Sequence, residues 1–154
     1  MIRTDAEYRE AVQRLEQDRA YLEQQRADLI AIDIVGDDQE RAMAPARSFY
    51  EQLREEVATY ERMRRGDFEP IYNLTSIGRM LIGLRIAYGL SQRELAERLD
   101  VSESVVSRDE RNEYFNISVA KAQRILDAFQ ARIRLELEEP VGLDRLVGAE
   151  AQVA

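Results

Sequence analysis

The hydrogen-bonding side chains of residues 102–112, SESVVSRDERN, recur at helical spacing. Ser104, Ser107 and Arg108 are separated by three residues and then by one, so a helix would present them on one face. Hydroxyl groups donate and accept single hydrogen bonds, whereas a guanidinium can satisfy two acceptors at once. Such groups suit the edges of nucleic-acid bases in a major groove, where each base pair displays its own pattern of donors and acceptors.

The composition argues against most enzyme chemistry. The chain has no histidine and no cysteine, which removes the commonest general base, the commonest metal ligand and every Ser-His or Cys-His nucleophile pair. We therefore expect no enzyme activity, no cofactor and no metal. No apolar run approaches the ~20 residues needed to span a bilayer, and the opening MIRTDAEYRE lacks the apolar centre of a signal peptide. These features predict a cytoplasmic protein without a membrane partner.

The charge is unevenly distributed along the chain. Lys plus Arg is 22 and Asp plus Glu is 30, which gives a net charge of −8. Residues 1–70 hold 11 basic and 17 acidic side chains, whereas residues 77–130 hold 8 of each. This asymmetry suggests two modules with different partners. Because phosphate binding depends on local basic groups, the acidic total does not exclude nucleic acid as a partner of residues 77–130.

The polar face of residues 102–112 falls within four short helical patterns. They cover about Ile77–Tyr88 and then begin at Ser91, at Ser102 and near Ser118. Ser91 and Glu94 have the spacing of a capping box, and Ser102 is expected to cap the third helix. Because only three or four residues separate the second and third helices, they must cross steeply.

An N-terminal pair of helices is predicted before this region. Thr4 and Glu7 have capping-box spacing, and a helical stripe runs from there to about Leu29. After a loop around residues 36–38, a second helix is expected to start near Pro45 and to stop at Gly66. One of its faces carries Phe49, Leu53, Val57 and Tyr60. An antiparallel hairpin buries only part of such a surface, so we expect a second copy or another protein to cover the rest.

The end of the chain changes period. In ARIRLELEE, residues 131–139, Ile133, Leu135 and Leu137 alternate with charged side chains, which predicts a β-strand. Its pairing partner stays open between residues 71–74, residues 30–35 and a second chain. The domains expected are an acidic helical hairpin for dimerisation or partner binding, a connector, a helix-turn-helix unit, and a strand with a flexible tail. Their ranges are 1–66, 67–76, 77–130 and 131–154.

Residues 77–129 resemble the helix-turn-helix domain of the Xre/Cro/cI repressor family. The residues that carry the resemblance are GLSQRELAERLDVSESVVSRDER, and the matching region covers about a third of the chain. It implies a mainly α fold with a lambda-repressor-like domain that binds DNA. By resemblance, Gln92 would hold a phosphate, and Arg85 and Glu110 would form a structural ion pair. The full set of residues expected at the DNA is Gln92, Ser102, Glu103, Ser104, Ser107, Arg108, Arg111, Asn112 and Tyr114. Arg79, Arg93 and Lys121 are further candidates for phosphate contacts.

Two acidic residues depart from the family pattern. Glu103 stands where glutamine is frequent, and it could accept a hydrogen bond from cytosine or simply favour the start of the helix by ~0.3–1 kcal/mol. Asp109 stands at an inward position that is usually apolar, so it must reach solvent or a base such as Lys121 or Arg124.

The sequence favours a DNA-binding repressor that acts as a homodimer on a near-palindromic double-stranded operator. A narrower hypothesis is an antitoxin, because IRTDAEYREAVQRLE and the acidic N-terminal region are similar to HigA-like antitoxins. Its hairpin would neutralise a basic toxin protein, and the whole would repress its own operon. The alternative from another class is a protein–protein adaptor that has lost DNA binding.

Overall fold

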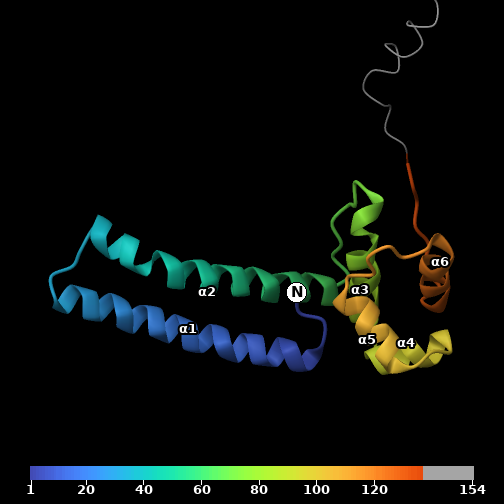
Figure 1. The fold of residues 1–154 in the computed structure, drawn as a ribbon, viewed down its shortest axis with the longest axis horizontal. Coiled ribbons are helices and arrows are strands. Elements are labelled where there is room, and N and C mark those ends of the chain that lie inside the picture. Colours follow the sequence, from blue (N-terminus) through green and yellow to red (C-terminus); the bar gives the residue numbers. More distant parts are fainter. Residues whose placement is uncertain (137–154) are drawn as a thin grey trace, which may run out of the picture.

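The computed structural model describes residues 1–136, which form six α-helices and one 3-10 turn. Two long helices make an antiparallel hairpin that projects from a compact group of four short helices (Figure 1). The bounds are α1 Asp5–Ala31, α2 Asp37–Arg64, η1 Leu74–Ser76, α3 Ile77–Ala87, α4 Gln92–Leu99, α5 Glu103–Arg111 and α6 Val119–Ala128. Within residues 1–136, none of the helices is apolar over a long enough stretch to cross a bilayer.

The first helix begins as predicted. The Glu7 amide donates to Thr4 Oγ1 over 3.2 Å, and Glu7 Oε2 accepts from the Thr4 amide over 3.2 Å and from the Arg3 amide over 2.7 Å. This capping box satisfies amides that have no partner inside the helix. Residues 1–4 are therefore tied to the first turn of α1.

The start predicted for the second helix was wrong. α2 begins at Asp37, eight residues before Pro45, which lies inside the helix. A proline there removes one backbone hydrogen bond, but Gln39 and Met43 are buried ahead of it, and the first turn carries acidic side chains that favour a helix N-terminus. The end at Gly66 was predicted closely. Gly66 has a φ of +71°, and the Asp67 amide closes the turn on the Arg62 carbonyl over 3.0 Å.

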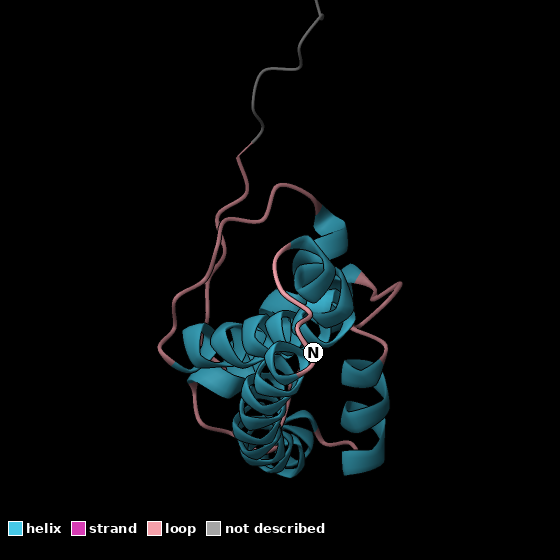
Figure 2. Cartoon of the chain, turned by 90° about the vertical axis from the view of Figure 1, so that its left-hand side faces the viewer, coloured by secondary structure: helices cyan, strands magenta, loops and turns pink. Residues whose placement is uncertain are grey.

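The two ends of the hairpin differ in burial. At the end next to the short helices, Val57 and Tyr60 are buried, and Tyr60 stacks on Tyr8 with ring centroids 5.0 Å apart. Farther out, the Phe49 side chain is 72 % exposed, so the predicted apolar face of α2 is only partly covered. Figure 2 looks along the hairpin and shows its two helices in front of the shorter ones. The base of the hairpin is packed, whereas its outer part offers apolar groups to solvent.

The four short helices were predicted correctly, and they share one core with the hairpin base. The largest fully buried apolar side chains are Leu81, Ile82, Leu95, Val106, Ile125 and Phe129. Ile2, Val57 and Tyr60 belong to the same cluster. At Gly78 in α3 a Cβ would overlap the Glu113 carbonyl oxygen, so the loop after α5 packs directly on the α3 backbone. The hairpin base therefore helps to support the short helices.

The predicted C-terminal strand is not supported. Residues 131–136 are not in a strand, and Figure 2 draws no strand in the described part of the chain. A strand needs a neighbour for its amides and carbonyls, and residues 30–35 and 71–74 offer helix ends, turns and the 3-10 turn instead. The rest of the prediction, residues 137–139, lies outside the described residues.

Candidate nucleic-acid interface

Helix α5 presents two different faces. Inward, Val106 is 2 % exposed and Glu110 is 0 % exposed, so both belong to the interior. Outward, Glu103, Ser104 and Arg108 are exposed, whereas Ser107 is half-buried. This arrangement follows from helical periodicity, because residues three and four apart lie on the same side. The outward side chains form what we call the α5 face: Glu103, Ser104, Ser107, Arg108 and Arg111.

Ser102 occupies the N-cap position of α5, but its side chain does not cap the helix as predicted. No backbone amide of α5 donates to its hydroxyl. That hydroxyl instead lies 2.9 Å from Ser104 Oγ, and the Ser102 carbonyl accepts from the Val105 amide over 3.0 Å. The Ser102 hydroxyl therefore bonds to the neighbouring hydroxyl and caps no α5 amide. Ser102 and Ser104 thus form one hydroxyl pair at the start of the α5 face.

A buried ion pair fixes α5 to α3. Arg85 Nε donates to Glu110 Oε1 over 2.5 Å, and Arg85 Nη2 donates to Glu110 Oε2 over 2.7 Å. The two side chains are 3 % and 0 % exposed. Two parallel bonds between planar groups fix both distance and orientation. The predicted pairing of Arg85 with Glu110 is present, and it sets the rotation of α5 about its own axis.

The same guanidinium reaches beyond Glu110. Arg85 Nη1 donates to the Leu90 carbonyl over 2.7 Å, just before α4, and Arg85 Nη2 donates to the Arg3 carbonyl over 2.8 Å. No sequence pattern indicates either acceptor, because a backbone carbonyl is present at every residue. Arg85 therefore links α3, α4, α5 and residues 1–4 at one point.

Gln92 takes part in this network as well. Its Nε2 donates to Glu110 Oε2 over 2.8 Å, a contact that sequence reasoning missed. A side-chain amide nitrogen carries two hydrogens, so one remains for another acceptor. Gln92 is the first residue of α4 and is partly exposed. Its amide is thus oriented by the buried pair while still reaching the surface beside α5.

The structure accounts for Asp109. Lys121 Nζ on α6 lies 2.5 Å from Asp109 Oδ2, so the carboxylate meets one of the two bases that were predicted for it. The Asp109 side chain is 19 % exposed and the Lys121 side chain is 42 % exposed. The other base, Arg124, donates to the Leu99 carbonyl over 2.8 Å at the end of α4. Asp109 therefore ties α5 to α6.

Most cations of the short helices already form ion pairs or hydrogen bonds with other residues of the chain. Arg79 pairs with Glu113 over 2.8 Å, Arg93 pairs with Glu97 over 3.1 Å, and Lys121 pairs with Asp109. By contrast, Arg108 and Arg111 form no ion pair with any residue in the range 1–136, and both are exposed. Arg98 and Arg124 form no ion pair either, but each donates to a backbone carbonyl. Within residues 77–130, the guanidinium groups with neither an ion pair nor a hydrogen bond thus belong to α5 itself.

Two further predicted residues lie just past α5. Asn112 is its C-cap and is exposed. Tyr114 is only 5 % exposed, and burial together with the nearby Glu110 carboxylate raises the pKa of its phenol above the usual range. A buried side chain cannot meet the DNA backbone, so the side-chain contact expected of Tyr114 is not available. Tyr114 lies in the loop between α5 and α6, and its side chain belongs to the core.

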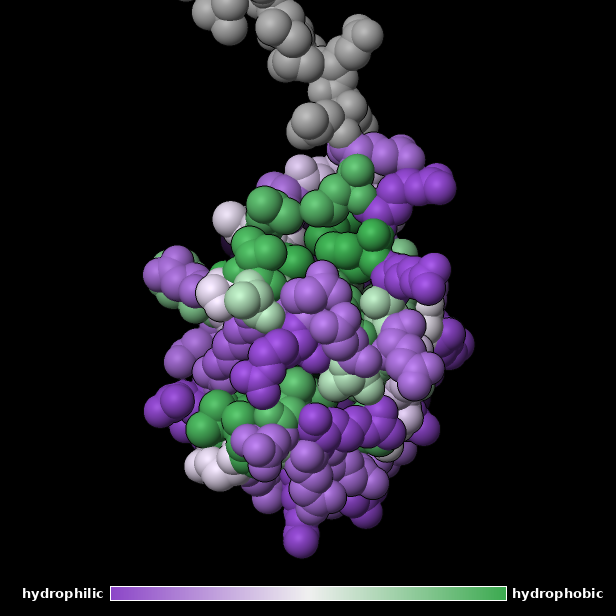
Figure 3. All heavy atoms as spheres, turned by 90° about the vertical axis from the view of Figure 1, so that its right-hand side faces the viewer, coloured by the Kyte–Doolittle hydropathy of each residue, from purple (hydrophilic) through white to green (hydrophobic). Residues whose placement is uncertain are grey.

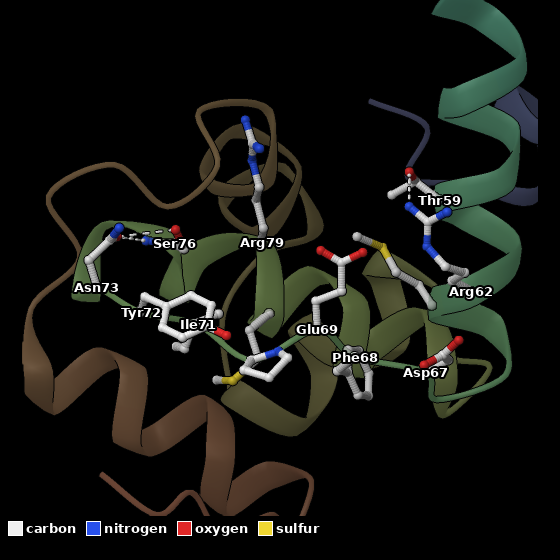
Figure 4. A pocket seen from close by; sticks show the side chains of 13 residues that line it. Thr59, Arg62, Asp67, Phe68, Glu69, Ile71, Tyr72, Asn73, Ser76 and Arg79 are labelled. Atoms are coloured by element: carbon white, nitrogen blue, oxygen red, sulfur yellow. Dashed lines mark hydrogen bonds between the residues drawn. The ribbon is translucent and has the colours of Figure 1, made fainter. Parts of the chain in front are cut away.

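A pocket of about 400 Å³ lies between the end of α2, the connector and the start of α3. Figure 4 shows Phe68, Tyr72 and Arg79 around it. Its arginines are already engaged, because Arg62 Nη2 donates to Thr59 Oγ1 over 2.9 Å and Arg79 pairs with Glu113. The pocket is separate from the α5 face, and none of the predicted base-reading residues lines it.

The comparisons with known proteins agree with this geometry. A family described as helix-turn-helix matches residues 82–135, a range that contains α4, α5, α6 and most of α3. Neither the curated proteins nor the solved structures gave a match. Within the matched range, α4 and α5 cross around a tight turn at Asp100 and Val101, and α5 keeps its polar face outward. Residues 82–135 therefore form a helix-turn-helix domain, which supports a DNA-binding transcription regulator of the Xre/cI-like kind.

Proposed function

We propose that this protein is a sequence-specific repressor that binds operator DNA as a homodimer, with α5 in the major groove. The observation that carries the proposal is the α5 face, where one exposed and one half-buried hydroxyl stand beside two arginines that have no intramolecular ion pair within residues 1–136. Ser104, Ser107 and Arg108 would contact base edges. Gln92, Arg111 and Asn112 would contact the phosphate backbone.

The charge of the domain supports a homodimer. Residues 77–130 hold equal numbers of acidic and basic side chains, so one copy gains little from phosphate attraction. Two copies on half-sites about one helical turn apart would double the contacts and would favour a near-palindromic operator. Figure 3, which views the helix-turn-helix end, shows apolar groups gathered on its upper half. Leu74, Phe115 and Val119 are highly exposed apolar residues of this part of the chain. Such a surface suits contact with a second copy.

Selection of random-sequence duplexes by the full chain tests the proposal. The wild-type protein should enrich a palindrome, and Arg108→Ala or Ser104→Ala should weaken binding to it by ~1–3 kcal/mol, or roughly 5- to 150-fold. Arg41→Ala is the matched control, because Arg41 is exposed on the hairpin and pairs with Asp38. If no sequence is enriched, or if all three variants bind equally well, α5 does not read DNA and an adaptor role replaces it.

Glu103 offers a finer test of base reading. It is the first residue of α5 and is exposed, a position that fits both a helix-end charge and a base contact. If its carboxylate accepts from a cytosine amino group, Glu103→Gln should change the preferred base at one operator position. An unchanged preference together with a small loss of stability would assign Glu103 to the helix end alone.

A second candidate function is neutralisation of a basic toxin by the hairpin. The outer part of the hairpin exposes Tyr21, Ile32 and Phe49, each at least 60 % exposed. Residues 1–70 are also net acidic, which suits a basic partner. In this version residues 1–66 bind the partner, residues 77–130 bind DNA, and both act in the cytoplasm. Co-purification with the product of an adjacent gene for a small basic protein, lost in Phe49→Asp but kept in Arg41→Ala, would support it. A neighbouring product that binds neither form would leave a simple repressor.

A further inference from the structure

We propose that residues 1–4, here called the N-terminal segment, position α5, so that DNA affinity depends on how this segment is seated. The proposal rests on the proposed DNA-binding function of α5. It concerns residues that form no hydrogen bond or ion pair with the α5 face and lie about a hundred positions away in sequence. The positioning acts through Arg85, which contacts the segment and the buried side of α5 at once.

Two contacts seat the N-terminal segment on the helix-turn-helix domain. The Ile2 side chain is 5 % exposed and belongs to the cluster that contains Ile86 and Leu95. The Arg3 carbonyl accepts a hydrogen bond from Arg85 Nη2 over 2.8 Å. An apolar anchor and a directed hydrogen bond therefore hold adjacent residues against α3.

The contact with Arg3 matters because Arg85 is 3 % exposed and its donors have few alternative partners. Nη2 divides its two hydrogens between the Arg3 carbonyl and Glu110 Oε2, and Nε donates to Glu110 Oε1. If the segment leaves, one buried donor loses its acceptor, and water can approach the ion pair. The pair then holds the rotation of α5 less firmly, and with it the Gln92 amide that is bonded to Glu110.

The same segment is also fixed to the hairpin. The Arg3 and Thr4 amides both donate to Glu7 Oε2 in the first turn of α1, over 2.7 Å and 3.2 Å. A movement at the base of α1 would therefore shift Ile2 and Arg3 against Arg85. Coupling of this kind is reciprocal, so DNA binding should also hold the segment more firmly.

The test replaces Ile2 by Asn, which removes the apolar anchor without adding charge. Binding is measured by fluorescence anisotropy with the duplex that the wild-type chain selects. We expect the dissociation constant to rise roughly 3- to 30-fold, the range for residues that modulate coupling without touching the ligand. Ile32→Asn is the matched control, because Ile32 is 67 % exposed on the hairpin turn. It should leave the dissociation constant unchanged.

General loss of stability must be separated from positioning. Val57→Ala removes core volume in the same cluster while leaving Ile2, the Arg3 carbonyl and Arg85 in place, so it serves as the destabilised control. Ile2→Asn should speed amide hydrogen exchange in the last turn of α5 and weaken DNA binding, whereas Val57→Ala should do neither while the protein remains folded. The milder Ile2→Ala replaces Ile2→Asn if the latter unfolds.

Equal affinities of the wild type and the folded Ile2 variant would overturn the positioning role while leaving DNA binding intact. An equal loss of affinity in Val57→Ala would overturn it as well, because stability alone would then explain the effect. Failure of the wild-type chain to select any duplex would instead refute the proposed function.

Discussion

Removal of Glu110 should destabilise this protein more than the loss of an ordinary buried side chain. In Glu110→Ala, the Arg85 guanidinium stays 3 % exposed, loses both bonds to the carboxylate, and keeps only the Leu90 and Arg3 carbonyls. Breaking a buried ion pair by removing one partner costs ~3–5 kcal/mol, because an uncompensated charge remains inside. The free energy of unfolding of a typical domain is only ~5–15 kcal/mol, so the folded population of Glu110→Ala should fall steeply.

Urea unfolding followed by far-ultraviolet circular dichroism measures this effect. With a slope of ~2 kcal/mol/M, the midpoint of Glu110→Ala should lie ~1.5–2.5 M below that of the wild type. The double variant Arg85→Met with Glu110→Leu leaves no buried charge and should be more stable than the sum of the single changes predicts. It should not recover fully, because the Leu90 and Arg3 carbonyls have lost their donor.

A midpoint of Glu110→Ala within ~0.5 M of the wild type would refute the idea that this pair is desolvated and tightly coupled. Strict additivity of the two single changes would refute it too, because a pair that shares two hydrogen bonds must show an interaction energy. Glu97→Ala is the matched control, since Glu97 and its partner Arg93 are exposed and such pairs contribute ~1 kcal/mol or less.

Four further perturbations probe other parts of the domain by the same unfolding assay. Gly78→Ala should destabilise the protein strongly, because the new Cβ would overlap a backbone oxygen, whereas Gly83→Ala should cost less, because its Cβ meets Phe68 Cε1 at 2.7 Å and a ring can shift. Asp109→Ala should cost ~1 kcal/mol or less, and less still at high salt, because its Lys121 partner is 42 % exposed. Tyr114 has a raised pKa, so the stability that it contributes is complete below its unfolded pKa of ~10 and is lost as the pH rises above that value.

Each of these expectations has an outcome that would contradict it. A stabilised Gly78→Ala would mean that the loop after α5 does not pack on α3. A loss of several kcal/mol in Asp109→Ala would mean that this pair is shielded from solvent, contrary to its exposure. For Tyr114, the midpoint is followed from pH ~8 to ~11, and Tyr114→Phe should reduce its decline. An identical decline in both proteins would assign the alkaline sensitivity to other groups, among them Tyr60, whose pKa is also raised by burial.

Local sequence patterns were sufficient for most helix boundaries in the described residues. The capping boxes at Thr4 and Ser91 form as predicted, because a hydroxyl and a carboxylate three residues apart meet whenever a helix starts between them. The helix start predicted near Pro45 was wrong. The preference of proline for a first helical turn stabilises the helix less than the burial of Gln39 and Met43 ahead of it does. The strand predicted from the alternation in residues 131–136 was wrong, because a strand also needs a neighbouring strand to pair with, and periodicity does not supply one.

For the candidate site, helix periodicity is enough to predict which side chains α5 turns outward, since Ser104, Ser107 and Arg108 have the spacing of one helix face. Which of the nearby cations remain available depends on the fold, because ion pairs such as Arg79–Glu113 join residues far apart in the chain. The fold also determines that Tyr114 is buried and that the Arg3 carbonyl reaches Arg85. Such contacts depend on how helices pack, and packing is set by the summed burial of many residues, which no short pattern encodes.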